Sequence, residues 1–267
     1  MKIPIAHIHG GESTLSAIDD SIRHSITKMS YLHFVSTNRY RNRIISMGEN
    51  PKRVINVGAM CGEAIKKFVP FEKKILEKKI NFVFRGEKVF LISFHPETLI
   101  GLSPLKQIYE LINALKKIEN VNFIFTSANV DSGSSKINGI ISNECKKNKN
   151  FFYYKSLGQK LYWSVMYYSD GLIGNSSSGI LEAPYFNKIF LNIGDRQKGR
   201  LQNKNVINVE LSEKKILKKM RKILNSRKKL SLKKNIYGNG KPSKTIVRYL
   251  SKKKIPSYPI KTFFEKK

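Results

Sequence analysis

Short apolar runs rich in β-branched residues alternate with longer amphipathic stretches along almost the whole chain. The short runs predict strands and the amphipathic stretches predict helices, a pattern typical of βα units around a parallel sheet. The expected strands cover residues 3–9, 33–37, 54–57, 89–94, 121–126, 151–154, 171–173, 189–192 and 206–209. The expected helices include residues 18–29, 40–47, 104–117, 159–168 and 212–224.

The distribution of these units predicts an α/β chain with two lobes. Residues 66–88 are charged and contain one strand-like piece, residues 82–84, so we interpret them as a connector. Residues 71–250 then hold about six strands, enough for a complete doubly wound domain. Residues 1–70 supply only three strands, which predicts a partial N-terminal lobe that lacks its opening units. Two prolines in the basic tail, residues 251–267, favour an extended or disordered segment.

Length and composition are those of a globular protein. The chain has 267 residues, of which 40% are hydrophobic, so it can bury a core. No apolar run reaches the length of about 18 residues that a membrane span needs, and no secretory signal precedes the first strand. We therefore expect a cytoplasmic protein. The cysteines, Cys61 and Cys145, lie far apart without metal-ligand spacing, so we expect neither a disulfide nor a metal site.

The formal net charge of +31 raises the question of nucleic-acid binding. Arginine supplies only 11 of the 50 basic residues, however, and recognition of phosphates and base edges favours its planar fork over lysine. The lysine runs coincide with expected helix faces and the tail, which favours a solvated surface. We expect no specific nucleic-acid partner, while a weaker attraction to anionic ligands stays open.

The strongest local motif begins where the strand at 171–173 ends. Gly174, Ser176 and Ser177 form a small polar turn before an expected helix, and a helix N-terminus favours an anion such as a diphosphate. Glu182 follows within the first turns of that helix, in reach of the ribose hydroxyls of a nucleotide. The alternative is an N-capped helix with an ordinary surface glutamate.

Further polar residues follow other expected strands. His95 comes directly after the strand at 89–94, where it can donate to phosphate oxygens or transfer a proton. Residues 129–133 and 194–200 also follow strands, and they carry Asn129 and Arg196. The carboxyl edge of an open α/β sheet is its ligand-binding edge, although a loop histidine and two plain turns are the alternative interpretation.

The first strand leads into a second polar motif. Gly10 and Gly11 would let the backbone approach a ligand closely, and His7, His9, Glu12, Asp19 and Asp20 gather titratable groups around them. Such groups can remove a proton beside a carbon that bears a leaving group. The alternative is that the aspartates only form helix-stabilising pairs four residues apart, Asp19 with Arg23 and Asp20 with His24.

Five segments together resemble the UDP-N-acetylglucosamine 2-epimerase family, particularly its hydrolysing branch. They are His-Ile-His-Gly-Gly-Glu at 7–12, Ile-Asp-Asp-Ser-Ile-Arg-His-Ser-Ile-Thr-Lys at 18–28, Phe-His-Pro-Glu-Thr at 94–98, Gly-Asn-Ser-Ser-Ser-Gly at 174–179 and Asn-Ile-Gly-Asp-Arg-Gln-Lys-Gly-Arg at 192–200. The resemblance extends to about Leu250. It implies two Rossmann-like lobes of the glycosyltransferase-B kind with the active site in the cleft between them, and chemistry without metal or other cofactor.

The resemblance also implies roles for individual residues. The nucleotide contacts would be His95, Asn129, Ser176, Ser177, Glu182 and Arg196. Asp19 matches one carboxylate of the family's acid–base set, but His9 stands where a family member has Glu, so His9 or Glu12 would fill that role. Together with His95, these residues would remove the C2 proton and expel UDP from C1, after which water adds with inverted C2 configuration.

One departure concerns the start of the chain. The family's first lobe opens with a Gly-Thr-Arg-type turn and carries a Gly-Asp-Arg segment, and this chain begins after both. We therefore expect weak or absent activity of the chain alone, or a companion polypeptide that supplies the missing part. The alternatives are a non-hydrolysing epimerase, an inactive UDP-sugar-binding protein and, least favoured, a retaining glycosyltransferase. Members of the family commonly form homo-oligomers, which we expect here too.

Overall fold

The computed structural model describes residues 3–14, 19–97, 101–128, 133–226, 230–232, 235–238, 241–252, 255–256 and 260–265. All nine expected strands form within them, each shifted by at most a few residues at its ends. The chain divides into two compact units. Unit 1 comprises residues 1–68, 199–201 and 234–267, and unit 2 comprises residues 69–198 and 202–233.

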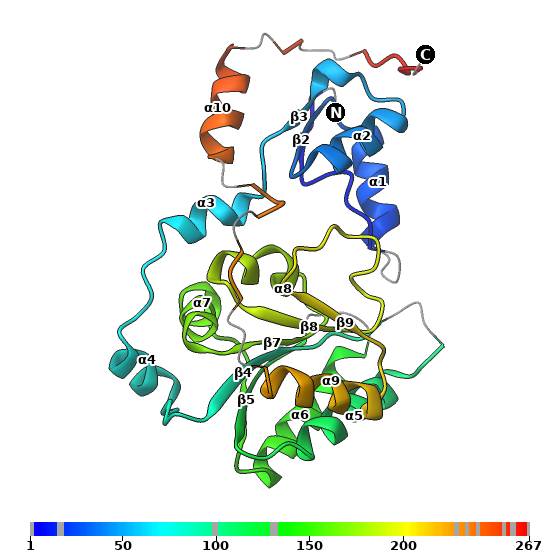
Figure 1. The fold of residues 1–267 in the computed structure, drawn as a ribbon. Coiled ribbons are helices and arrows are strands. Elements are labelled where there is room, and N and C mark those ends of the chain that lie inside the picture. The colour runs from blue at the N-terminus through cyan, green and yellow to red at the C-terminus, as the bar shows by residue number, and fades with distance from the viewer. Residues whose placement is uncertain are drawn as a thin grey trace. The chain divides into compact units, whose positions relative to one another are not determined.

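Unit 2 contains a six-stranded parallel sheet with the order β6-β5-β4-β7-β8-β9 (Figure 1). Its strands are β4 (Lys88–Ser93), β5 (Val121–Thr126), β6 (Phe151–Tyr154), β7 (Gly171–Gly174), β8 (Ile189–Ile193) and β9 (Val206–Val209). Numbered from β4, this is the order 3-2-1-4-5-6 of a doubly wound dinucleotide-binding fold. The strand order reverses between β4 and β7, and ligands of such sheets bind at that switch point, outside the carboxyl ends of the strands.

Helices cover both faces of this sheet. They are α4 (Lys73–Ile80), α5 (Pro104–Lys116), α6 (Ser134–Lys147), α7 (Gly158–Tyr168), α8 (Ser178–Leu181) and α9 (Glu213–Leu224), with the 3₁₀ turn η2 at Ala183–Phe186. Figure 1 shows α5, α6 and α9 on one face and α7 and α8 on the other. In α5 the apolar residues recur at helical spacing, at Ile108, Leu111, Ile112 and Leu115, and all four are fully buried. This face holds the main core of the unit.

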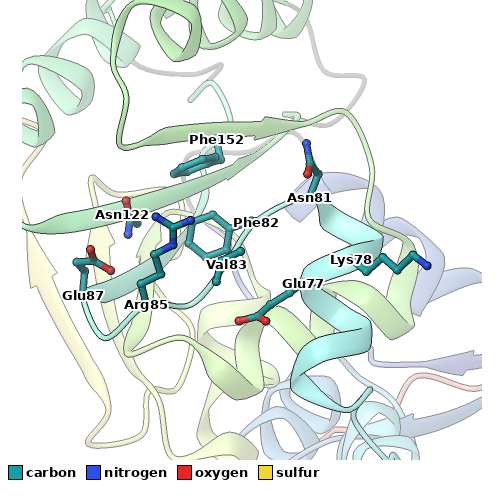
Figure 2. Close-up of a pocket in the computed structure, with 9 residues that line it drawn as sticks. All are labelled: Glu77, Lys78, Asn81, Phe82, Val83, Arg85, Glu87, Asn122 and Phe152. Carbon is teal, nitrogen blue, oxygen red and sulfur yellow. The ribbon is translucent and has the colours of Figure 1, made fainter.

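The connector between the lobes is more ordered than its charge suggests. Helix α4 forms there because Leu76 and Ile80 bury one side of an otherwise lysine-rich segment. The strand-like interpretation of residues 82–84 is wrong. Phe82 instead packs edge to face on Phe84 and Phe152, with ring centroids 4.9 and 4.6 Å apart. These aromatic rings adjoin a hollow of about 560 Å³ near the amino ends of β4 and β5 (Figure 2).

Unit 1 is built on a three-stranded parallel sheet, β1 (Ala6–Ile8), β2 (Leu32–Val35) and β3 (Val54–Asn56), in that order. Its helices are α1 (Asp19–Met29), α2 (Asn38–Ser46), α3 (Met60–Lys66) and α10 (Pro242–Lys252), and Pro51–Arg53 forms the 3₁₀ turn η1. No helix in the described parts of either unit is long and apolar enough to cross a bilayer.

The C-terminal segment belongs to unit 1. Ile246 of α10 packs with Leu32, Phe34 and Val57, and farther along Phe264 N–H donates to the Gly48 carbonyl at 2.9 Å. The sequence-based division instead placed residues up to 250 in the second lobe. The amphipathic pattern of α10 shows which face is apolar, but it contains no information on which unit receives that face.

Candidate functional site

The site in unit 2 lies at the carboxyl ends of β4 and β7, where the strand order reverses. Gly174 ends β7 with φ +133°, and a Cβ atom there would come within 2.1 Å of the Ser93 carbonyl oxygen. Only glycine allows this approach, because it has no Cβ and tolerates positive φ. The two strand ends therefore deliver their following residues, His95 and Asn175, next to each other.

Asn175 fastens these two loops together. Its Oδ1 accepts a hydrogen bond from His95 N–H at 2.8 Å, and its Nδ2 donates to the His95 carbonyl at 2.8 Å. The side chain is fully buried. The asparagine thus replaces the ladder hydrogen bonds that end with the strands, and it holds His95 at the carboxyl edge of the sheet.

His95 is held as a neutral imidazole. Burial, and secondarily the charge of Arg196, lower its pKa to about 3. Arg196 lies in the loop after β8 and donates from Nη1 to the Asn175 carbonyl at 3.2 Å. His95, Asn175 and Arg196 therefore meet at one edge of the sheet. A neutral histidine here can donate a hydrogen bond from whichever ring nitrogen carries the proton.

Glu97 supports the Arg196 loop, a role that the sequence did not suggest. Its buried carboxylate accepts the Asp195 N–H at 3.0 Å, and its backbone is bonded in both directions to the side chain of Gln107. Burial raises the pKa of Glu97 despite hydrogen bonds from the backbone of Asp195 and Arg196. The only hint in the sequence that Glu97 has a role was its place in the Phe-His-Pro-Glu-Thr segment.

The serine turn differs from the prediction in one respect. Helix α8 begins only at Ser178 and has four residues, so its dipole is that of a single turn. The Ser178 N–H and hydroxyl are directed to Ser176 Oγ, at 3.4 and 3.1 Å, and Ser178 Oγ is also bonded to Tyr162. Since Ser176 accepts the Ser178 hydroxyl hydrogen, it can donate its own to a ligand. The turn therefore presents a hydroxyl donor beside a helix of only one turn.

Glu182 ends α8 and points at Trp163 of α7. The Trp163 Nε1–H donates to Glu182 Oε2 at 3.0 Å, and burial raises the pKa of this carboxyl. A carboxylate accepts several hydrogen bonds, so this contact orients Glu182 and leaves capacity for ribose hydroxyls. The remaining predicted nucleotide contact, Asn129, lies outside the described residues.

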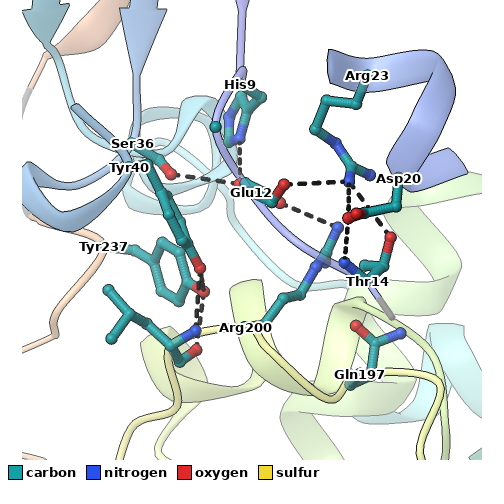
Figure 3. Close-up of polar contacts among 12 residues, drawn as sticks. His9, Glu12, Thr14, Asp20, Arg23, Ser36, Tyr40, Gln197, Arg200 and Tyr237 are labelled. Carbon is teal, nitrogen blue, oxygen red and sulfur yellow. Dashed lines mark hydrogen bonds and ion pairs between the residues drawn. The ribbon is translucent and has the colours of Figure 1, made fainter. Parts of the chain in front are cut away.

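In unit 1, His9 and Glu12 form a hydrogen-bonded pair just beyond β1 (Figure 3). The Met60 N–H donates to His9 Nε2 at 3.3 Å, which identifies Nε2 as the unprotonated nitrogen. His9 Nδ1–H therefore donates to Glu12 Oε1 at 3.0 Å. His9 adopts the left-handed conformation, with φ +65°, which turns its ring back toward Glu12.

Glu12 is buried among cationic partners. Its Oε2 contacts Arg200 Nη2 at 2.9 Å, and Ser36 Oγ at the end of β2 donates to Oε1 at 3.3 Å. Burial alone raises its pKa, but the His9 hydrogen bond and the charges of Arg200 and Arg23 outweigh that effect and lower it. Glu12 is thus an ionised anchor, whereas the His9 side chain is 28% exposed.

The two aspartates at the start of α1 have different surroundings. Asp20 pairs with Arg23 and His24, each at 3.5 Å, and accepts the Thr14 N–H at 2.7 Å. The predicted Asp20–His24 pair is therefore present, while Arg23 contacts Asp20 in place of its predicted partner. Asp19 is the first residue of α1 and is exposed.

The two glycines of the first motif serve packing in this structure. Gly11 has φ +77°, and a Cβ there would meet the Tyr40 carbonyl oxygen at 2.6 Å, while one on Gly10 would meet the His7 ring at 2.8 Å. They let the loop lie close against α2. Among the described residues, no three His, Cys, Asp or Glu side chains are arranged to hold a metal ion.

Comparison with known proteins adds independent evidence. The family model described as UDP-N-acetylglucosamine 2-epimerase matches residues 1–251. A Campylobacter jejuni protein named GDP/UDP-N,N'-diacetylbacillosamine 2-epimerase (hydrolyzing) is 45% identical over 214 residues, 80% of this chain and 56% of the relative. The Escherichia coli polysialic acid biosynthesis protein P7 is 44% identical over 219 residues, 81% of this chain and 55% of the relative. The chain thus spans about half the length of these relatives.

A solved structure supports the fold. The UDP-GlcNAc 2-epimerase from Neisseria meningitidis, crystallised with UDP-GlcNAc, matches with a TM-score of 0.79 at 21% identity. The match covers 94% of this chain and 71% of that one. The likeness confirms the expected α/β architecture of the glycosyltransferase-B kind.

Proposed function

Because the chain belongs to the UDP-N-acetylglucosamine 2-epimerase family, we propose that it acts in the hydrolysing 2-epimerisation of a UDP-linked N-acetylated hexosamine. The products are UDP and a free mannosamine-type sugar, a precursor of the sialic and legionaminic kind of acidic sugar. The name of the Campylobacter jejuni relative supports the hydrolysing reaction, and that of the Escherichia coli relative supports a role in sialic acid synthesis.

One observation supports UDP binding by unit 2 most strongly: its polar residues gather at the switch point of a doubly wound sheet. His95 and Arg196 are held there by Asn175, and Ser176 can donate its hydroxyl hydrogen. We assign the diphosphate to Arg196, His95, Ser176 and Ser177, the ribose to Glu182, and a further nucleotide contact to Asn129.

For the chemistry at the sugar, the structure favours His9 as the base and Glu12 as the residue that orients it. Glu12 is ionised and accepts the Nδ1 proton, so the lone pair of His9 lies on Nε2. In the first step Nε2 exchanges the long Met60 contact for the C2 proton. The C1–O bond to the diphosphate then breaks, and a C1–C2 double bond forms.

The second step adds water across that double bond. A hydroxyl bonds to C1, and a proton reaches C2 from the face opposite to the one that lost it, which inverts C2. We propose the exposed carboxylate of Asp19 as the second acid–base group of this step. His95, held neutral by burial, can support departure of UDP by hydrogen bonding.

The nucleotide assignment is tested by calorimetry with UDP on the 267-residue chain. Glu182→Gln keeps an oxygen for Trp163 but removes the charge that attracts ribose hydroxyls, so we expect UDP affinity to fall about tenfold. Glu119→Gln, which removes an exposed carboxylate near the start of β5, is the control and should leave affinity unchanged. Equal affinity of wild type and Glu182→Gln would contradict the assignment.

Turnover is tested by following UDP release and the sugar product from UDP-N-acetylglucosamine and its diacetylbacillosamine analogue. Free mannosamine-type sugar supports hydrolysis, whereas UDP-linked product indicates the non-hydrolysing reaction, and UDP binding without product indicates a binding protein. His9→Gln should lower the rate of UDP release at least about a hundredfold, since that is the usual contribution of general base catalysis.

Two finer expectations are also part of the proposal, namely a homo-oligomer and a cytoplasmic location. The homo-oligomer rests on the resemblance to the family, and the cytoplasmic location rests on the sequence, in which no apolar run is long enough for a membrane span. Sedimentation of the purified chain and fractionation of the producing cells test them.

A further inference from the structure

Arg200 contributes only part of its hydrogen-bonding capacity to the protein. Its Nη2 contacts Glu12 Oε2 at 2.9 Å, and its side chain is only 9% exposed. Among the residues that the structure describes, its Nε and Nη1 have no hydrogen-bond partner although both are buried. A guanidinium carries five N–H donors, and a buried donor without an acceptor costs about 1–3 kcal/mol.

The surroundings of Arg200 select for an anion. Arg23 reaches the same loop, with Nη1 3.4 Å from the Glu12 carbonyl and 3.2 Å from Thr14 Oγ1. The charge of Arg200, after burial, lowers the pKa of Arg23, so the two cations repel each other across this cluster. The buried Glu12 carboxylate compensates the charge of Arg200, and the partly exposed Asp20 carboxylate pairs with Arg23. A further anionic oxygen would relieve the repulsion.

The position of Arg200 is fixed independently of Glu12. The next residue, Leu201, is held by both of its backbone groups: its N–H donates to Tyr40 Oη at 2.9 Å, and Tyr237 Oη donates to its carbonyl at 2.8 Å. The two buried tyrosines are also bonded to each other at 3.1 Å. A guanidinium with a fixed backbone and free donors is suited to grip a ligand with little loss of entropy.

We propose that Arg200 is a substrate-binding residue that donates from Nε or Nη1 to an oxygen of a diphosphate. This inference rests on the proposed function for the choice of a diphosphate, whereas the preference for an anionic oxygen derives from the cluster itself. Glu12 holds the guanidinium through Nη2, which leaves Nε and Nη1 for the ligand.

The test measures binding of inorganic diphosphate and of UDP to the 267-residue chain at constant ionic strength. Arg200→Gln should lower the affinity for both about tenfold to a hundredfold, in the range expected for lost charge-assisted hydrogen bonds. Arg200→Lys keeps the charge but not the planar guanidinium, so its affinity should lie between those of wild type and Arg200→Gln. Arg221→Gln removes an exposed arginine on α9, so it controls for non-specific attraction to a chain of net charge +31.

A second background separates direct binding from an effect through Glu12. In this background the Glu12→Gln variant is compared with the double variant Glu12→Gln, Arg200→Gln. If Arg200 touches the diphosphate, Arg200→Gln should still lower the diphosphate affinity there. The proposal is overturned if that loss disappears in the Glu12→Gln background, or if Arg221→Gln weakens diphosphate binding as much. Should Arg200→Gln fail to fold, as judged by its unfolding transition, Arg200→Lys decides by the same criteria.

The two reagents also distinguish this inference from the proposed function. If diphosphate binds in an Arg200-dependent manner but UDP binds no more tightly, the nucleotide assignment to unit 2 fails and the Arg200 site stands. If UDP binds in a Glu182-dependent manner but Arg200→Gln changes neither affinity, the proposed function stands and this inference fails.

Discussion

At the scale of single residues, Asn175 shows how one buried side chain joins two strand ends. It satisfies both the N–H and the carbonyl of His95 where the strand ladder has already ended. Buried backbone groups that lose their partners cost about 1–3 kcal/mol each. The position of His95 at the carboxyl edge of the sheet therefore depends on an amide that itself makes no proposed contact with substrate.

This dependence gives a prediction. Asn175→Ala should lower the free energy of unfolding by about 2–4 kcal/mol, since two buried backbone groups lose their partners. It should also weaken UDP binding, and urea unfolding with calorimetry measures both effects. Asn175→Asp keeps the acceptor for His95 N–H but buries a negative charge against the His95 carbonyl, so its loss should be at least as large. A variant Asn175→Ala as stable as wild type would contradict this account.

At the scale of elements, α10 shows that a lysine-rich amphipathic segment can still anchor a unit. Ile246 is 7% exposed and packs on Leu32, Phe34 and Val57, whereas its neighbour Val247 is 64% exposed. The phenol ring of Tyr249 adds an edge-to-face contact with Phe34 at 5.8 Å. The helix therefore supports β2, the strand that carries Ser36 at its carboxyl end.

We expect Ile246→Ala to lower the free energy of unfolding by about 2–4 kcal/mol, as removal of a buried isoleucine usually does. The adjacent substitution Val247→Ala removes a similar apolar group from the exposed face and should change stability by less than about 0.5 kcal/mol. Urea unfolding of the two variants measures the difference. Equal losses would show that α10 does not pack on unit 1 through this face.

Elements also differ in how well pattern predicts them. The four inner strands of unit 2, β4, β5, β7 and β8, are almost entirely buried and read as continuous apolar runs bounded by turns, so they were predictable. The aromatic run at 82–84 resembles such a strand, yet it joins neither sheet, and the Phe82 ring packs on Phe152 instead. Strand pairing is a tertiary property.

At the scale of the whole molecule, the net charge of +31 must be reconciled with a compact fold. Lysines on exposed faces, such as Lys214, Lys218 and Lys222 of α9, lie four residues apart and repel one another. Uncompensated charge of one sign destabilises the compact state. The unfolded chain spreads the same charge over a larger volume.

Salt should therefore stabilise this protein. Raising NaCl from about 10 mM to about 150 mM shortens the screening length from about 30 Å to about 8 Å, and Tm should rise by several degrees. The triple substitution of Lys214, Lys218 and Lys222 by Gln should raise Tm at low salt and reduce its response to added salt. A Tm that falls with salt in thermal melts would indicate that attractive ion pairs dominate.

The sequence by itself determined the order and type of the strands, the family, and the residues that follow the strands of unit 2, because buried parallel strands and polar turns leave local patterns. The tertiary structure decided which groups meet. Only folding brought Asn175 to His95, Glu97 to the loop of Arg196, and Arg200 to Glu12, since each pair is separated by 80 or more residues along the chain. Such pairings arise when strands that are distant in sequence lie side by side and bring their following loops together. No periodicity in the sequence encodes them.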